Sequence, residues 1–292
     1  MSVLINKKTK VLVQGITGTQ ASFHVQRAIK YGTNIVAGVV PSKKESKHLG
    51  VPLFKTVKEA QKKTGATASM IFVPAGNAKS AIIEAIDAKM DLIVVITSGI
   101  TVNDMLEVKE HLKNSETILI GPNTPGIITP NEAYLGIFPD IFENSGDIGL
   151  ISRSSTLTYE VILEINKLGL GESTVVGLGD DDIIGSNYIK IIEEFNKDRK
   201  TKAIALIGGI GGHYEKETAK ALAKLKRKKP IIALMLNDPT PLSDINSIAS
   251  EVIYGDFNSE TDEETLFKNS GMTIVKSISE LKEELLKLWK TW

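Results

Sequence analysis

Short apolar runs alternate with helical segments along most of the chain, and this alternation constrains the fold more than any other feature. In the first half, apolar runs of strand length occur at Val11–Val13, Asn34–Val40, Ala68–Val73, Asp91–Ile96 and Thr117–Ile120. The segments between them place apolar residues at helical spacing. Strands that are apolar throughout are typical of a parallel sheet with helices on both faces. The first half therefore predicts a doubly wound α/β domain.

The alternation stops at the loop GPNTPG, residues 121–126, and restarts near Gly146. We expect the segment from this loop to Asn144 to be irregular. Beyond it, the sequence predicts strands at Asp147–Ser152, Ser173–Leu178, Ala203–Ile207, Ile231–Met235, Val252–Tyr254 and Met272–Val275, and a last helix at Ile278–Trp289. A chain of 292 residues is long enough for two domains of ordinary size. We predict domains at 1–145 and 146–292.

The composition excludes several classes of function. Basic and acidic residues number 35 each, so no overall field attracts nucleic acid or an anionic membrane. The absence of cysteine excludes disulfides, thiolate nucleophiles and cysteine metal ligands. No apolar run approaches the roughly 20 residues that span a bilayer, and the N-terminal residues lead into the first strand without a targeting segment. We expect a cytoplasmic protein that binds neither nucleic acid nor membrane.

The stretch Lys10 to His24, KVLVQGITGTQASFH, joins the first strand to the first helix through Gly15 and Gly18. A strand that turns on glycines into a helix leaves unpaired backbone N–H groups at the positive end of that helix, where they can bind a phosphate. The spacing departs from the G-x-G-x-x-G pattern of dinucleotide sites. The stretch therefore indicates a nucleotide-type cofactor without identifying it.

The end of the second strand narrows the choice of cofactor. Dinucleotide sites carry an acidic residue there for the ribose hydroxyls, whereas this chain reads VVPSKKES, with Lys43 and Lys44. Two ammonium groups suit a ribose phosphate, such as the 3′-phosphate of coenzyme A (CoA). NAD is therefore disfavoured, and CoA and NADP remain. An alternative interpretation is that both lysines belong to a solvated surface loop.

Strings over nearly the whole chain resemble the alpha subunit of succinyl-CoA synthetase, also called succinate–CoA ligase. They include GITGTQASFH, PSKK, GATASMIFVPA, LIVVITSGI, IGPNTPGIITP and SRSSTLTYE. The resemblance implies a Rossmann-like CoA-binding domain followed by a flavodoxin-like ligase domain. It also implies a partner, an ATP-grasp beta subunit that binds ATP or GTP with Mg. The expected assembly is a hetero-oligomer that ligates a small carboxylate to CoA, as in the tricarboxylic acid cycle.

The resemblance also implies binding residues. Four residues match the CoA-phosphate turn of the family, and a lysine matches its CoA lysine: Thr17, Gly18, Thr19, Gln20 and Lys43. Strand-end residues match further contacts to CoA or an acyl-CoA: Val73, Pro74, Ile96, Thr97 and Ser98. Asn123 and Tyr159 match the substrate region of the family.

The resemblance fails where the family carries its phosphoryl chemistry. The family passes a phosphoryl group through a histidine in a G-H-A-G string, because neutral imidazole is nucleophilic near pH 7. This chain reads DINSIASEV there, with Ile248 at the histidine position. The glutamate that orients the histidine is replaced by Gly209. Isoleucine cannot accept a phosphoryl group, so we assign no catalytic residue to this chain.

Two neighbouring features bear on the same site. The family's G-G-D-P-I-P-G loop becomes Asp180-Asp181-Asp182-Ile183-Ile184-Gly185, and three carboxylates there oppose a bound phosphoryl dianion. They are interpreted as an Asp-rich turn in preference to a cation site. The chain has four histidines: His24, His48, His111 and His213. Only His213 follows a strand of the second domain, and we interpret it as a solvated loop residue.

Three hypotheses follow from these residues. In the first, the chain is a CoA-binding subunit of an NDP-forming acyl-CoA ligase whose phosphohistidine is missing. In the second, it is a catalytically silent pseudo-subunit that binds CoA or acyl-CoA and stabilises or regulates a ligase complex. In the third, it is an NADP-binding reductase, which the glycine pattern and the GPNTPG loop do not favour.

Overall fold

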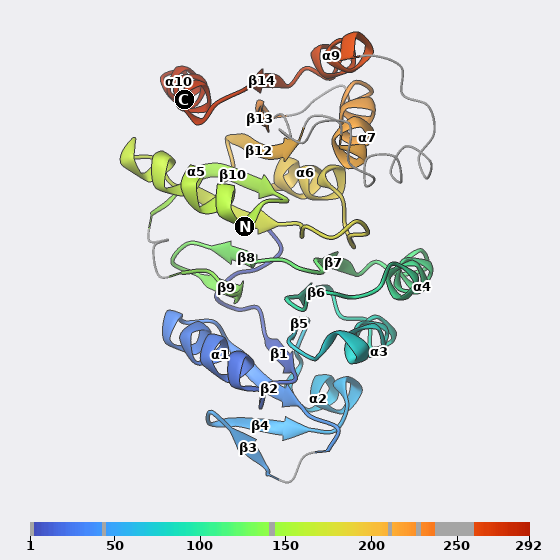
Figure 1. The fold of residues 1–292 in the computed structure, drawn as a ribbon. Coiled ribbons are helices and arrows are strands. Elements are labelled where there is room, and N and C mark those ends of the chain that lie inside the picture. Colours follow the sequence, from blue (N-terminus) through green and yellow to red (C-terminus); the bar gives the residue numbers. More distant parts are fainter. Residues whose placement is uncertain (1–2, 43–44, 140–143, 210–211, 226–228, 237–259) are drawn as a thin grey trace.

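The computed structural model describes residues 3–42, 45–139, 144–209, 212–225, 229–236 and 260–292. In this part of the chain the strands form two sheets that follow one another along one direction and do not pack face to face. Helices lie on both sides of the strands (Figure 1). The first sheet has the order β3-β4-β2-β1-β5-β6-β7. Its strands are β1 (Val11–Gln14), β2 (Ile35–Val39), β3 (Lys47–His48), β4 (Val51–Phe54), β5 (Ala68–Ile71), β6 (Leu92–Val95) and β7 (Ile118–Ile120).

The connectivity of the first sheet confirms the predicted doubly wound domain. All of its strand pairs are parallel except β3 with β4. Numbered along the chain, the parallel strands lie in the order 3-2-1-4-5-6 of a Rossmann fold. Ligands of such sheets bind where the strand order reverses, outside the carboxyl ends. Here that point lies between β1 and β5, where β1 runs into the Gly15 turn.

Four helices cover the first sheet, and their ends follow local sequence signals. They are α1 (Thr19–Tyr31), α2 (Val57–Thr64), α3 (Ala75–Asp87) and α4 (Val102–Leu112). α1 ends at Gly32, whose φ of +108° lies in the left-handed region that glycine adopts without steric cost. Thr56 and Thr101 cap α2 and α4 by accepting hydrogen bonds from Glu59 N–H and Asp104 N–H.

The second sheet has the order β14-β13-β12-β10-β11-β8-β9. Its strands are β8 (Gly126–Thr129), β9 (Ala133–Gly136), β10 (Ser145–Ser152), β11 (Glu172–Gly177), β12 (Ala203–Gly209), β13 (Ile231–Leu236) and β14 (Thr273–Val275). Numbered from β10, the parallel strands lie in the order 2-1-3-4-5, which is the flavodoxin-like order. The predicted fold class is therefore confirmed for both sheets.

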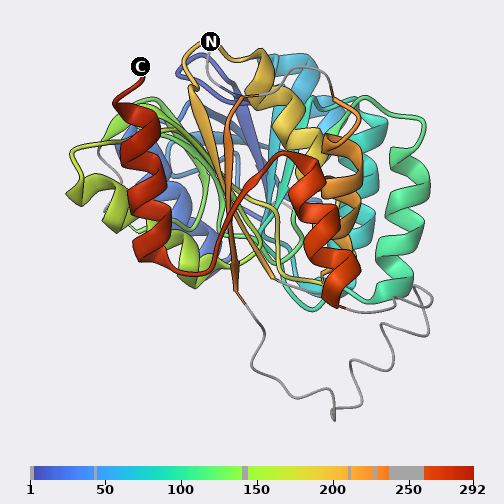
Figure 2. The same ribbon diagram turned by 90° about the horizontal axis from the view of Figure 1, so that it is seen from above.

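The helices of the second sheet continue the two helical layers of the first. They are α5 (Ser155–Lys167), α6 (Tyr188–Lys197), α7 (His213–Leu222), α9 (Glu260–Ser270) and α10 (Ile278–Trp289). Seen from above, α1, α5 and α10 lie on one side of the strands and the other helices on the opposite side (Figure 2). Both layers bury extensive apolar surface against the strands.

The segment expected to be irregular contains ordered strands. β8 and β9 form a hairpin, and β8 pairs antiparallel with β11 at the end of the second sheet. The hairpin also contacts the segment that follows α1, because Thr33 Oγ1 donates to Tyr134 O over 2.9 Å. The sequence did not predict the hairpin, nor strands β3 and β4, because all four strands are short and interrupted by proline, glycine or polar residues. The predicted strand at Val252–Tyr254 lies outside the described residues.

Candidate functional site

The Gly15 turn lies at the carboxyl end of β1, as predicted. Gly15 has a φ of +78°, and a Cβ there would lie 3.1 Å from Val73 Cγ1 and 3.2 Å from Val73 N. Glycine is therefore required both by the backbone conformation and by the close approach to Val73. The Gly18 N–H closes the turn by donating to Gly15 O over 3.1 Å. The turn consequently packs directly against the end of β5.

Residues Thr17 to Gln20 are exposed and open α1 without a side-chain cap. Gly18 is the N-cap residue; among the described residues no side chain accepts from the first N–H groups of the helix, and its first turn has no acidic residue. Helices α3 and α7 also start without a side-chain cap, whereas serine, threonine or asparagine side chains cap α2, α4, α5, α6 and α10. The helix start at Gly18 can therefore accept an anion at its N–H groups. This is the fit expected for a phosphate of CoA.

The other predicted strand-end residues lie beside this turn and are joined to one another by a series of hydrogen bonds. Thr97 Oγ1 donates to Val73 O over 2.6 Å, and Asn123 N–H donates to Thr97 O over 2.9 Å. Asn123 Nδ2 then donates to Asp181 Oδ1 in the second domain over 2.9 Å. The ends of β5, β6 and β7 are thus fixed to one another and to the loop after β11. Pro74 and Ser98 are exposed at this edge and Ile96 is half-buried.

A second group of functional candidates lies where the order of the second sheet reverses, between β10 and β12. Ser154 caps α5 there by accepting a hydrogen bond from Leu157 N–H over 3.3 Å. Arg153 crosses to the loop after β11, where it donates to Gly179 O and Asp181 O over 3.3 and 3.0 Å. Burial raises the pKa of Asp180, Arg153 opposes this shift, and Asp181 adds to it.

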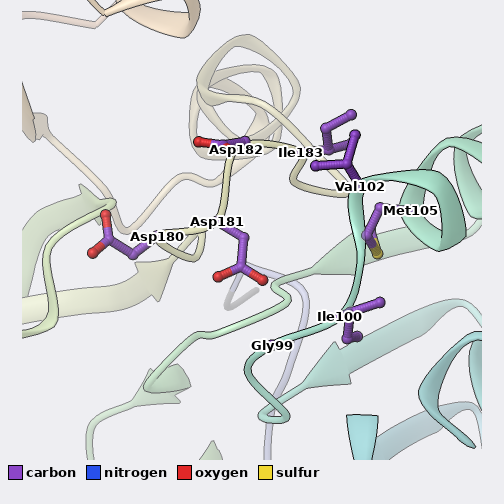
Figure 3. Close-up of a pocket in the computed structure, with 8 residues that line it drawn as sticks. All are labelled: Gly99, Ile100, Val102, Met105, Asp180, Asp181, Asp182 and Ile183. Carbon is purple, nitrogen blue, oxygen red and sulfur yellow. The ribbon is translucent and has the colours of Figure 1, made fainter. Parts of the chain in front are cut away.

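The loop after β11 and the loop after β6 enclose a crevice of about 290 Å³. One side is apolar, formed by Ile100, Val102, Met105 and Ile183, and Asp180 to Asp182 line the other (Figure 3). Lys109 on α4 closes the junction nearby, because its Nζ donates to Gly185 O over 2.8 Å. Burial lowers the pKa of this lysine. The crevice lies between the two domains, beside the site residues Thr97 and Asn123.

Comparison with known proteins supplies the family. A model of the CoA binding domain matches residues 6–99, and a model of CoA-ligase matches residues 151–246. Subunit alpha of the ADP-forming succinate–CoA ligase from Aquifex aeolicus is 44% identical over 292 residues, which are 99% of this chain and 95% of that protein. The chain belongs to the succinate–CoA ligase alpha-subunit family. The same subunit from Staphylococcus aureus strain Mu50 is 41% identical over 290 residues, which are 99% of this chain and 96% of that protein.

Solved structures share the fold of this chain at lower identity. ATP citrate lyase from Methanothrix soehngenii, in complex with citrate and coenzyme A, superposes with a TM-score of 0.84 at 22% identity. The alignment covers 99% of this chain and 51% of that one, so this chain spans about half of the lyase chain. Acetyl-coenzyme A synthetase 1 of Ca. Korarchaeum cryptofilum, in complex with phosphate and ADP, has a TM-score of 0.71 at 20% identity. That alignment covers 94% of this chain and 59% of the synthetase chain.

Some of the residues singled out from the sequence lie apart from the strand-end group, and others lie outside the described residues. Tyr159 lies on α5, where its ring meets that of Phe138 edge-on at 6.2 Å and burial raises its pKa. His213 begins α7 and faces Glu217, with 3.3 Å between Nε2 and Oε1. His24 lies on α1, stacked on Phe72, and burial lowers its pKa, with Arg27 adding to the shift. Lys43 and Ile248 lie outside the described residues.

The sequence analysis missed a carboxylate beside Gly209. Glu215 on α7 is 3% exposed; its Oε1 accepts a hydrogen bond from Gly209 N–H over 3.2 Å and lies 3.3 Å from Tyr188 Oη, which donates its hydrogen to Ile207 O over 2.7 Å. A Cβ at Gly212 would lie 2.0 Å from Oε2, so this glycine makes room for the side chain. The string GGHYE, a glycine turn with a glutamate in the first turn of the next helix, was the available signal.

In the described part of the chain, no three histidine or acidic side chains converge as a metal ion requires. The same residues contain no helix long and apolar enough to cross a bilayer.

Proposed function

We propose that the chain is the CoA-binding, alpha-type subunit of an NDP-forming acyl-CoA ligase of the succinyl-CoA synthetase type, and that it carries no phosphohistidine of its own. The observation that supports CoA binding is the uncapped start of α1 at the Gly15 turn, within the segment that matches the CoA binding domain. The names of the related subunits support the ligase reaction.

Each part of the proposed CoA site has a physical task. The N–H groups of Thr17, Thr19 and Gln20 bind the diphosphate at the positive end of α1, while the Gly18 N–H closes the turn on Gly15 O. Lys43 pairs with the 3′-phosphate. Val73, Pro74 and the strand end Ile96 to Ser98 line the rest of the cofactor's path, and Asn123 and Tyr159 contact the carboxylate substrate. When bound, CoA supplies the thiol that takes the acyl group.

The phosphoryl step is assigned to the assembly and not to this chain. Ile248 has no nucleophilic atom, and Gly209 has no side chain with which to orient a histidine. Glu215 Oε1 accepts a hydrogen bond from Gly209 N–H over 3.2 Å, and its Oε2 is buried without a hydrogen-bond partner among the described residues. We therefore propose that an ATP-grasp partner binds ATP or GTP with Mg and forms the acyl phosphate. A catalytically silent pseudo-subunit that regulates such a complex is the second candidate, favoured by the same substitution.

Titration of the purified chain with CoA and with NADP tests the cofactor. We expect CoA to bind more tightly than NADP, because residues 6–99 match the CoA binding domain and the Gly15 turn departs from the glycine pattern of dinucleotide sites. Dephospho-CoA should bind about 10-fold more weakly than CoA, since the charge-assisted hydrogen bonds to the 3′-phosphate are lost. Isothermal titration calorimetry at constant ionic strength measures the Kd of each of the three ligands. Tighter binding of NADP than of CoA would overturn the assignment.

Incubation with γ-labelled ATP tests the missing relay. The chain is mixed with its ATP-grasp subunit, and a related alpha subunit that carries the G-H-A-G string serves as the positive control. We expect no acid-labile, base-stable label on this chain, because phosphoramidates form on histidine and residue 248 is isoleucine. Such a label on this chain would refute the proposal. The same complex is then assayed for acyl-CoA. If acyl-CoA forms although this chain carries no label, the complex is an active ligase; if none forms, the chain is a silent pseudo-subunit.

A further inference from the structure

Ser22 and His48 form a hydrogen-bonded pair directly behind the Gly15 turn. Ser22 lies in the first turns of α1, and His48 lies in β3, in the hairpin at the β2 edge of the first sheet (Figure 1). The distance between Ser22 Oγ and His48 Nε2 is 2.7 Å, and Ser22 Oγ also lies 3.0 Å from Ile16 O. Both side chains are half-buried.

The direction of these hydrogen bonds follows from the atoms present. A carbonyl oxygen can only accept, so the single hydroxyl hydrogen of Ser22 goes to Ile16 O. The hydroxyl oxygen must then accept from His48, so Nε2 carries a hydrogen. This is satisfied by the imidazolium and by the neutral tautomer with hydrogen on Nε2. The result is a continuous series from His48 through Ser22 to the carbonyl of Ile16.

Fixing the carbonyl of Ile16 also fixes the N–H of Thr17. The two groups belong to one planar, trans peptide unit and point in opposite directions. Among the described residues, none accepts a hydrogen bond from the Thr17 N–H. Ser22 holds the turn a second time, because its own N–H donates to Gly18 O over 2.8 Å. A series of hydrogen bonds that ends on Ile16 O also polarises the Thr17 N–H at the other end of the peptide.

We propose that Ser22 and His48 are positioning residues for the cofactor, which hold the Ile16–Thr17 peptide with its N–H directed at the diphosphate of CoA. This inference rests on the proposed CoA site. His48 touches no cofactor atom in this arrangement and acts through Ser22.

The test measures the Kd of the full chain for two ligands, CoA and dephospho-CoA. Ser22→Ala and His48→Phe should each raise both Kd values about 3- to 10-fold, the effect of one hydrogen bond. The factor should be the same for both ligands, because both carry the diphosphate. Lys43→Ala should instead raise the Kd for CoA and leave the Kd for dephospho-CoA unchanged. The double variant should resemble either single variant, since the two residues act in one series.

Conservative variants separate positioning from folding. Ser22→Thr keeps the hydroxyl and His48→Gln keeps an N–H donor, so both should restore affinity to within about 2-fold of the unchanged chain. Ser279→Ala, at an exposed serine of α10, is the matched control and should change neither Kd. Unchanged Kd values for folded Ser22→Ala and His48→Phe would overturn the inference, as would a failure of both conservative variants to rescue. Failure of the unchanged chain to bind CoA would instead refute the proposed function.

Discussion

Replacing Glu172 by glutamine is expected to stabilise the protein by about 2–4 kcal/mol at pH 8 and to have little effect at pH 4. Glu172 begins β11 and is fully buried, and neither carboxylate oxygen has a hydrogen-bond partner among the described residues. Burial raises the pKa of this carboxyl group from 4.5 to about 8, because the charged form loses its hydration. Glutamine has nearly the same shape and never ionises.

The sign of the pH dependence follows from proton binding. Between pH 4.5 and about 8, Glu172 keeps its proton in the folded chain and loses it in the unfolded chain. The folded state therefore binds more protons, and the free energy of unfolding falls as the pH rises through this window. Above about pH 8 both states are ionised and the loss is complete. Glu172→Gln removes this dependence, so its stabilising effect should grow with pH and then level off.

Urea unfolding at several pH values between 4 and 9 measures the difference between the two chains. Taking the difference cancels the titration of all other groups that Glu172 does not contact. Glu160→Gln, at an exposed position of α5, is the control and should give a difference near zero at every pH. A Glu172→Gln difference that stays constant from pH 4 to 9 would show that Glu172 is not buried as a neutral acid.

The sequence predicted the long, regular elements well, because their signals are local and strong. Each predicted strand and helix of the first domain recurs in the structure within a few residues, and the expected C-terminal helix at Ile278–Trp289 has the same bounds as α10. Strands buried on both faces are apolar throughout, so a single sequence suffices to find them. The doubly wound order then follows from the connection rules for parallel strands.

The elements that were missed depend on contacts between distant residues. The pair of strands β8 and β9 is stabilised by β11 and by Thr33 at the end of α1. Its sequence, GIITPNEAYLG, has no strict alternation to reveal it. The same holds for β4, VPLF, in which the proline argues against a strand although the strand pairs parallel with β2.

Prediction of the candidate site divides in the same way. Glycine turns and strand ends can be located from the sequence, because glycine marks the backbone conformation and the strand fixes the edge. The residues that orient these groups cannot be located from the sequence alone. Glu215 reaches Gly209 across a turn, and His48 reaches Ser22 from a separate hairpin. Such partners become visible only when the fold brings the two segments together.

Replacing Gly179 by alanine is expected to destabilise the protein by at least about 3 kcal/mol more than the same change at Gly169. Both glycines have positive φ, +104° at Gly179 and +73° at Gly169, so alanine at either costs about 1–2 kcal/mol in backbone strain. The surroundings differ. A Cβ at Gly179 would lie 2.1 Å from Pro122 O, whereas nothing lies within 4 Å of one at Gly169.

The close contact at Gly179 has a consequence beyond stability. Because the Pro122 oxygen is backbone, the loop 121–123 must move to admit a methyl group, and this loop carries Asn123, whose N–H donates to Thr97 O. Denaturant unfolding gives the stability of the two variants, and titration with CoA below the unfolding transition gives their affinity. We expect Gly179→Ala to weaken CoA binding and Gly169→Ala to leave it unchanged.

Equal stability of the two variants would show that the junction between the sheets is more compliant than the contact between Gly179 and Pro122 indicates. Equal affinity despite unequal stability would separate the junction from the cofactor site, because the strand end at Thr97 would then hold its position without the loop.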